Sequence, residues 1–282
     1  MYKKIDRPVI LFEFEFFGGQ MDELLEILTQ RLAQPPLEKE SCLTLVTPNP
    51  EQVVLTRSNP LFQTALQKAD VRIPDGIGLV YASKMYALLH GVDSLSQRLA
   101  GKAVVSRLLA WVQDQSVPVL VIGGRSLGEG ADDPSMDDRA QRLKPVFLGQ
   151  ESAVVTDSWF WIEGYAHAES PTEEEEIQVR AMIRTLQPKL VFVALGAPHQ
   201  ELWLESHRAF LAANNVRVAM VVGGAFDVLT GSLKQPPVWM EKAGFEWLFR
   251  LWQEPWRWRR QLQLLQFVGM TMSELTRQSK TK

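Results

Sequence analysis

Four short runs of almost wholly apolar residues, separated by segments with helical periodicity, limit what this chain can fold into. The runs cover residues 43–47, 117–122, 190–195 and 216–222. Strands that are apolar on both faces are typical of parallel sheets, because helices cover such sheets on both sides. We therefore predict an α/β protein with a Rossmann-like, mostly parallel sheet flanked by helices.

The chain divides into three regions around this pattern. Residues 1–40 form an N-terminal extension, in which we predict one strand over 9–17 and one helix over 22–32. Residues 41–235 form the α/β domain. Residues 236–282 form a C-terminal appendage that is rich in basic residues and tryptophan. We predict that this appendage is helical, because its apolar side chains recur at helical spacing.

Composition excludes several classes of protein. Of the 282 residues, 46% are apolar and 22% are charged, as in an ordinary globular protein. Cys42 is the only cysteine, which excludes an intramolecular disulfide and a cysteine-cluster metal site. The longest apolar runs, such as 216–226, have about half the length that a membrane-spanning helix needs. Glu13 and Glu15 interrupt the apolar N-terminal stretch, so it is unlike a signal peptide and we expect a cytoplasmic protein.

Charge is unevenly distributed along the chain. Residues 234–282 hold nine Lys or Arg and four Asp or Glu, whereas residues 1–233 hold 21 basic and 29 acidic residues. Five of the nine tryptophans lie in the same basic segment. Its candidate arginines are Arg250, Arg257, Arg259 and Arg260. Two interpretations stay open: a helix pair packed on the body, or a contact with an anionic membrane surface. The net negative charge of the body argues against nucleic acid as a partner.

Glycines and polar residues follow the predicted strands at their carboxyl ends. In parallel sheets these ends lie at one edge, where ligands bind. Glycine turns at this edge let backbone amides approach a phosphate. The candidates are Thr47, Asn49, Asp75, Gly76, Gly123, Gly124, Gly196, Gly223, Gly224 and Asp227. Residues 123–130 do not match the GxGxxG pattern, which disfavours a nicotinamide-dependent enzyme.

Asp75 is the candidate for acid–base chemistry. It lies in Pro74-Asp75-Gly76, directly after the short extended segment 71–73. This tripeptide is also good turn chemistry, and a turn alone is the simpler interpretation. A carboxylate at the mouth of a cleft can instead act as a general base.

We predict no metal site and no cofactor. The sequence has no Asp-x-Asp triplet, and the acidic residues between 132 and 138 are interpreted as a solvated loop. His199 and His207 lie eight residues apart on one predicted helix and are interpreted as surface or structural residues. A bound pyrophosphate would then need backbone amides and basic side chains, such as Arg98 and the arginines of the appendage.

Six stretches of the chain match one known family in the same order. They are 47–51 (TPNPE), 74–78 (PDGIG), 98–101 (RLAG), 196–201 (GAPHQE), 223–227 (GGAFD) and a Trp- and Arg-rich run over 237–260. Each stretch is weak evidence alone, but their shared order over about residues 42–262 is specific. The sequence resembles the WecG/TagA/CpsF glycosyltransferases, which form glycosyltransferase family 26.

The resemblance implies an activity. It implies inverting, metal-independent transfer of an N-acetylmannosamine-type sugar from a UDP-sugar to a polyprenyl-diphosphate-linked sugar, in surface polysaccharide synthesis at the inner face of the cytoplasmic membrane. Asp75 and Thr47 would be catalytic, with Asp75 as the general base. Arg98 and the arginines of the appendage would face phosphates. The remaining substrate-binding residues would be Asn49, Gly76, Gly123, Gly124, Gly196, His199, Gln200, Gly223, Gly224 and Asp227.

The chain departs from the family pattern in four places. His199 stands where the family usually has lysine, and residues 1–40 are an extra piece. Residues 125–168 are longer than usual, and residues 91–97 lengthen the approach to Arg98. The main alternative function is a non-catalytic protein that binds nucleotide sugars or acts as a membrane scaffold. Exposed Phe and Leu side chains expected in the appendage favour a homo-oligomer, with dimer and trimer both open.

Overall fold

A mostly parallel sheet forms the centre of the protein. The computed structural model describes residues 8–34, 42–124, 141–142, 159–225, 236–237, 240, 246–253 and 258–278. Within these residues, a seven-stranded sheet has the strand order β4-β3-β9-β8-β5-β7-β6. Its strands are β3 (Leu43–Val46), β4 (Val71–Arg72), β5 (Val119–Gly123), β6 (Gln141–Arg142), β7 (Trp159–Ile162), β8 (Leu190–Ala194) and β9 (Val218–Val221). All neighbours are parallel except β6, which is antiparallel to β7. The predicted α/β class is confirmed.

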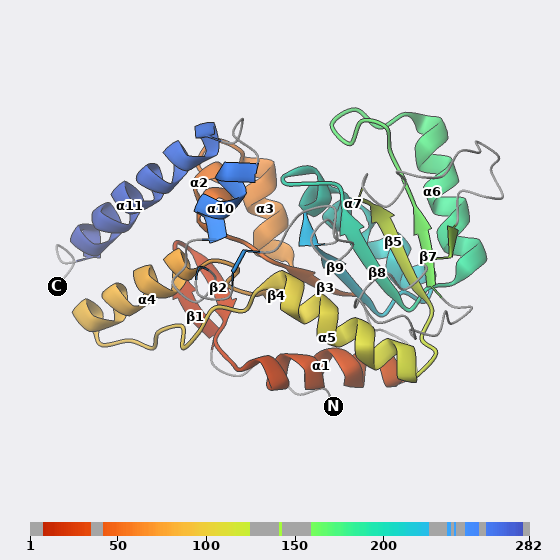
Figure 1. The fold of residues 1–282 in the computed structure, drawn as a ribbon, viewed down its shortest axis with the longest axis horizontal. Coiled ribbons are helices and arrows are strands. Elements are labelled where there is room, and N and C mark those ends of the chain that lie inside the picture. The colour runs from red at the N-terminus through yellow and green to blue at the C-terminus, as the bar shows by residue number, and fades with distance from the viewer. Residues whose placement is uncertain are drawn as a thin grey trace.

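Helices cover both faces of this sheet (Figure 1). They are α1 (Met21–Ala33), α2 (Pro50–Leu55), α3 (Pro60–Lys68), α5 (Gly101–Asp114), α6 (Glu173–Leu186) and α7 (His199–Ala213). The apolar stripes of α1 and α5 pack in one core with Val119 and Val121 of β5. The helices α2, α3, α6 and α7 share a second core with Leu120 and Ile122 of the same strand. Successive strand residues are therefore buried on opposite faces, which explains why the strands are continuous apolar runs.

The N-terminal extension begins with a hairpin, and the prediction of one strand over 9–17 is wrong. Strand β1 (Pro8–Leu11) pairs antiparallel with β2 (Phe14–Phe17) in a separate two-stranded sheet. Phe12 and Glu13 form the turn, with φ angles of 52° and 69°. Positive φ at both central positions suits the twist of a two-residue hairpin. The sequence conceals this turn because its apolar alternation continues through it and no glycine or asparagine marks it.

Two long helices beside this hairpin complete the described fold. Helix α4 (Ile77–His90) directly follows the β4 loop, and α11 (Trp258–Gln278) lies against α2 and α4. The Phe267 ring of α11 is buried with its centroid 5.3 Å from that of Phe12 in the hairpin turn. Both helices extend from the body on the same side of the molecule, at the left of Figure 1. The predicted helical appendage is therefore present, with α10 (Glu246–Gln253) preceding α11.

Candidate active site

Backbone hydrogen bonds join the carboxyl ends of neighbouring strands into one edge. The amide of Asp75, after β4, donates to the carbonyl of Pro48, after β3, over 3.0 Å. Further along the strand order, the amide of Gly124, after β5, donates to the carbonyl of Ala194, at the end of β8, over 3.1 Å. Segments that are far apart in the sequence therefore present their candidate residues along the same edge, as expected for a parallel sheet.

Asp75 lies in a polar group built from three segments. The Arg98 side chain donates from Nη2 to Oδ1 of Asp75 over 3.1 Å, and a longer contact of 3.4 Å comes from Nε. A Cβ atom placed on Gly101 would lie 3.2 Å from Cγ2 of Thr47 and 3.4 Å from Oδ2 of Asp75. The structure thus brings Thr47, Asp75 and Arg98 together at the start of α5. Both members of the Asp75–Arg98 pair stay partly exposed, so the pair is accessible from solvent.

Close packing explains the glycine at position 76. A Cβ atom there would lie 2.7 Å from Cδ of Pro50, the first residue of α2. The adjacent Asn49 caps α2: its side chain accepts from the amide of Gln52 over 3.0 Å, and the Gln52 side chain accepts from the amide of Asn49 over 3.1 Å. This reciprocal pair is a capping box, which fixes the start of the helix beside Asp75. The Asn49 side-chain oxygen therefore has a structural partner, and its role toward a sugar stays a prediction.

Gln200 belongs to a buried chain of amides rather than to an open surface. Its Oε1 accepts from the amide of Gly223 over 3.1 Å, which fixes the loop after β9. Its Nε2 donates to Oε1 of Glu201 over 3.0 Å, and Nε2 of Gln52 donates to the same oxygen over 3.0 Å. Gln200 is only 2% exposed. The network thus joins the first turns of α2 and α7 to the loop after β9, and it orients Gln200 toward that glycine loop.

Glu201 is the residue at this edge that sequence reasoning missed. It stands within a matching stretch, but its position gives no sign that its carboxylate is 1% exposed. Burial raises the pKa of Glu201 to about 7, because water can no longer stabilise the charged form. Its Oε2 has no hydrogen-bond partner within the described residues. A carboxyl group of this kind is neutral below pH 7, and it holds two amides through one oxygen.

The glycines between β5 and β8 allow two loops to approach closely. Gly123 has a φ of +89°, and a Cβ atom on it would lie 2.6 Å from the carbonyl oxygen of Ala194. Gly124 and Gly196 also have positive φ values, of 81° and 77°. Any other residue at Gly123 would therefore separate the loops at the ends of these neighbouring strands.

Several predicted residues lie elsewhere at this edge or outside the described residues. His199 begins α7 and is partly exposed, and Gly223 and Gly224 follow β9. Asp227 and Arg257 lie outside the described residues. Arg250 belongs to α10, and Arg259 and Arg260 to α11, but their side chains are not among those described. Their roles stay predictions.

The titratable side chains in the described parts of the chain do not gather as metal ligands. No group of three or more His, Cys, Asp or Glu residues in those parts is placed to hold a metal ion. Cys42 is buried, and its burial raises the pKa of the thiol to about 12, which makes it a poor nucleophile.

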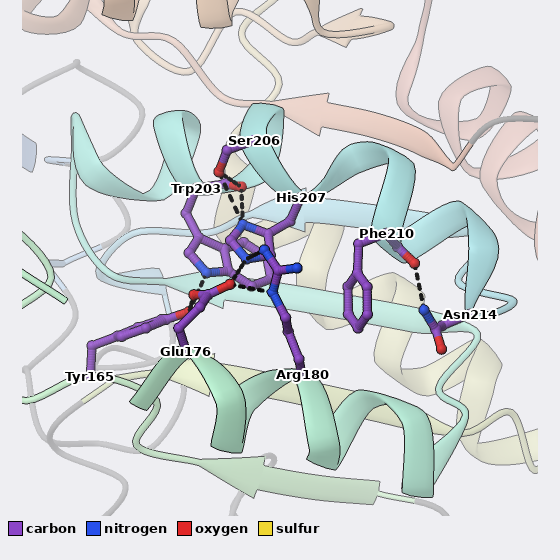
Figure 2. A network of polar contacts seen from close by, with 8 residues as sticks. All are labelled: Tyr165, Glu176, Arg180, Trp203, Ser206, His207, Phe210 and Asn214. Atoms are coloured by element: carbon purple, nitrogen blue, oxygen red, sulfur yellow. Dashed lines mark hydrogen bonds and ion pairs between the residues drawn. The ribbon is translucent and has the colours of Figure 1, made fainter. Parts of the chain in front are cut away.

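A second polar network joins α6 to α7 (Figure 2). Glu176 of α6 accepts from the Tyr165 hydroxyl over 2.6 Å and from Nε of Arg180 over 2.5 Å, and it pairs with His207 of α7. The Trp203 indole donates to the Tyr165 hydroxyl over 2.6 Å. Partial burial opposes ionisation of Glu176, but hydrogen bonds from its three partners outweigh it and lower the pKa to about 2. His207 is buried in this network, in agreement with a structural role.

Comparisons with known proteins agree with this architecture. The Glycosyl transferase WecG/TagA/CpsF family matches residues 9–281. The chain is 30% identical over 248 residues to an N-acetylglucosaminyldiphosphoundecaprenol N-acetyl-beta-D-mannosaminyltransferase of Bacillus spizizenii, covering 88% of this chain and 86% of that relative. It is 28% identical over 229 residues to the enzyme of the same name from Bacillus subtilis, covering 81% of this chain and 78% of the relative. The match extends over the hairpin, the sheet and α11, so the chain belongs to the WecG/TagA/CpsF family of glycosyltransferases.

Proposed function

We propose that this protein transfers an N-acetylmannosamine-type sugar from a UDP-sugar to a polyprenyl-diphosphate-linked sugar, with inversion and without a metal ion. The observation that carries the proposal is the placement of Asp75 at the end of β4, paired with Arg98 and beside Thr47. The names of the two Bacillus relatives support both the sugar and the lipid-linked acceptor.

Asp75 acts as the general base in this proposal. A sugar hydroxyl has a pKa far above 7, so it becomes a good nucleophile only as its proton leaves. Oδ2 of Asp75 accepts that proton while the acceptor oxygen forms a bond to the anomeric carbon of the donor. Base catalysis of this type contributes about 10²–10⁴-fold to the rate. Arg98 holds the other carboxylate oxygen, which keeps the carboxylate oriented.

The leaving group in this reaction is UDP. The bond from the anomeric carbon to the diphosphate oxygen breaks as the acceptor attacks from the opposite face, so the anomeric configuration inverts. Negative charge then develops on the departing diphosphate. Helix α5 begins at Gly101 without a side-chain cap, and the partial positive charge of its N-terminus lies beside Thr47 and Asp75. This helix end and the arginines of the appendage would stabilise the departing charge.

The composition of the C-terminal appendage favours binding to an anionic membrane surface. Trp247, Trp252 and Trp258 are exposed, with 74% of Trp252 accessible. Tryptophan favours the headgroup region, and arginine pairs with anionic lipid. No described helix is long and apolar enough to cross a membrane. We therefore place the protein peripherally at the inner face of the cytoplasmic membrane, where a lipid-linked acceptor is within reach.

The test measures UDP release in EDTA from a panel of UDP-sugars that includes UDP-N-acetylmannosamine. A short-chain, water-soluble polyprenyl-diphosphate-GlcNAc serves as acceptor. Release that depends on the acceptor and survives EDTA is the expected result. UDP binding without release on any donor would instead favour the non-catalytic nucleotide-sugar-binding or scaffold alternative.

A further inference from the structure

Helix α4 has an exposed apolar end that the proposed chemistry does not use. Its first turns are anchored in the core by Leu79 and Val80. From residue 84 to its end at 90 no side chain is buried. Two leucines are among these accessible side chains: Leu88 is 86% exposed and Leu89 is 61% exposed. Tyr81, Met85 and Val92 are also exposed. A helix that is apolar on its outward side as well as its inward side needs a partner for the outward side.

The neighbouring helix α11 has a similar outward face. Its exposed apolar residues are Leu262, Leu265, Val268 and Met272. The two helices are in contact. Their packing is close, because a Cβ atom placed on Gly78 of α4 would lie 3.6 Å from the ring of Phe267 of α11. Both extend from the body on the same side (Figure 1). Their exposed side chains therefore belong to one end of the molecule.

The charge of these two helices differs from that of the rest of the chain. Residues 77–92 contain Lys84 and no acidic residue. Residues 258–278 contain three arginines and one glutamate, whereas the whole chain has a net charge of −3. Apolar side chains accompanied by net positive charge complement the surface of an anionic bilayer.

We propose that the outer half of α4, with Met85, Leu88 and Leu89, inserts into the interface of an anionic membrane. This inference rests on the proposed function for its purpose: α4 starts two residues after Asp75, so it links the site of transfer to the bilayer that contains a polyprenyl chain. Fourteen residues of helix span about 21 Å. The length of α4 thus limits how far above the lipid surface Asp75 can lie.

A bilayer explains these observations better than a second copy of the chain. Most of the exposed α4 side chains are at the tip of a helix that leaves the body, rather than on a broad flat face. The helix begins at the candidate active site, where the lipid-linked acceptor must arrive. A second copy on this tip would cover the route of that acceptor.

The first test uses fluorescence and leaves the apolar face nearly intact. Cys42 is buried, so a Leu88→Cys variant labelled with a polarity-sensitive dye reports on α4. Addition of vesicles rich in phosphatidylglycerol should shift its emission to the blue, and lipids with quenchers on their acyl chains should quench it. The matched control is Ile177→Cys on α6, where Ile177 is 60% exposed at the far end of the sheet and should show neither change.

The second test removes the apolar contact. The Leu88→Ser/Leu89→Ser variant should bind anionic vesicles about tenfold less tightly, because two leucines no longer leave water. It should keep its transfer rate on the water-soluble acceptor and lose rate on a long-chain acceptor in vesicles. Ile177→Ser should match the wild type in both assays.

The outcomes separate this inference from the proposed function. If the wild type transfers no sugar to the soluble acceptor, the proposed function fails, whereas dye insertion at position 88 still tests the membrane contact. Absence of a dye shift, or vesicle binding unchanged in the serine variant, overturns the inference. Light scattering that shows a multimer of the 32.0 kDa chain, dissociated by the same serine pair, would assign the tip to a subunit interface instead.

Discussion

The pairing of Asp75 with Arg98 leads to a prediction for the Asp75→Asn variant, in which an amide nitrogen replaces one carboxylate oxygen. Asp75→Asn keeps the shape of the side chain and an oxygen for Arg98, but an amide cannot accept the proton of the acceptor. We expect turnover to fall by about 10²–10⁴-fold, with UDP affinity and melting temperature close to those of the wild type. Turnover and thermal melts measure both effects.

Asp70→Asn is the matched control for that experiment. Asp70 lies at the opposite end of β4, where it accepts from the amide of Thr44 over 2.7 Å and from Nη2 of Arg208 over 2.5 Å. The control should lower the melting temperature and leave turnover per folded molecule unchanged. Wild-type turnover in Asp75→Asn would refute the assignment of the base.

Glu201 leads to a prediction about pH. Its pKa is raised by burial to about 7, so the folded protein binds this proton more tightly than the unfolded chain does. Its contribution is fully present below the unfolded pKa of about 4.5 and is lost as the pH rises through 7. Glu201→Gln is a neutral mimic that keeps an oxygen for Gln52 and Gln200.

We therefore expect Glu201→Gln to gain stability relative to the wild type between pH 5 and pH 8, by up to about 3 kcal/mol. Denaturant unfolding at several pH values measures this difference. The same substitution at the exposed Glu174 controls for the loss of a charge. If the Glu201→Gln and wild-type curves stay parallel across this range, the carboxyl group does not titrate as described.

At the scale of elements, the Glu176 network makes the contact between α6 and α7 sensitive to acid. The pKa of Glu176 is lowered to about 2, so its stabilising contribution is present above pH 4.5 and is lost as the pH falls toward 2. Glu176→Gln should cost about 2 kcal/mol at pH 7, because Arg180 and His207 lose a charged acceptor. Its stability should also depend less on pH between 5 and 3. Equal losses at pH 7 and pH 3 would contradict this account.

The hairpin turn offers a prediction of the opposite sign. Glu13 is an exposed turn residue with a φ of 69°, a conformation that costs about 1 kcal/mol for a residue with a Cβ atom. Glu13→Gly should therefore raise the free energy of unfolding by about 0.5–1 kcal/mol. Glu15→Gly, two residues later in extended β2, should lower it. Denaturant melts of both variants compare the two positions.

These elements show what the sequence could and could not predict. The parallel strands β3, β5, β8 and β9 were predictable because each is a continuous apolar run buried on both faces, as Val119 to Ile122 illustrate. The parallel strand β7 (Trp159–Ile162) was not predicted. The turn at Phe12 and Glu13 was not, because tertiary packing of Phe12 on Phe267 selects a conformation that local propensity disfavours. Helix α3 was not predicted, because it follows α2 after only a short turn. Its start signals are nevertheless present: the Asn59 side chain caps the helix and Pro60 is its first residue.

The candidate site divides in a similar way. The order of motifs predicted which residues gather at the strand ends, and Thr47, Asp75 and Arg98 do lie together. The inward orientation of Gln200 and the burial of Glu201 depend on how α7 packs against α2, which the sequence of either helix alone does not specify.

At the scale of the whole molecule, the uneven distribution of charge along the chain predicts that membrane binding depends on salt. The body is acidic and the C-terminal segment is basic. Binding to anionic vesicles should weaken markedly between 0.1 M and 1 M salt, where the screening length falls from about 10 Å to about 3 Å. A residual, salt-resistant part should remain and should decrease in Trp252→Ser, whose ring is mostly exposed. Co-sedimentation measures both parts, and binding that is insensitive to salt would refute the electrostatic contribution.

The short strand β4 lies at one margin of the main sheet, and the loops of β8 and β5 lie three and four strands away from it. At about 4.8 Å per strand, Asp75 is separated from the Gly196 loop by roughly 14 Å. If the lipid-linked sugar enters beside α4 and the nucleotide lies along the glycine loops, two different parts of the chain recognise the two substrates. Mutations in one part can then accumulate without disturbing the other. Enzymes with this scaffold can therefore change the acceptor that they recognise while they keep the same donor sugar. This is a route to diversity among the polymers of bacterial surfaces.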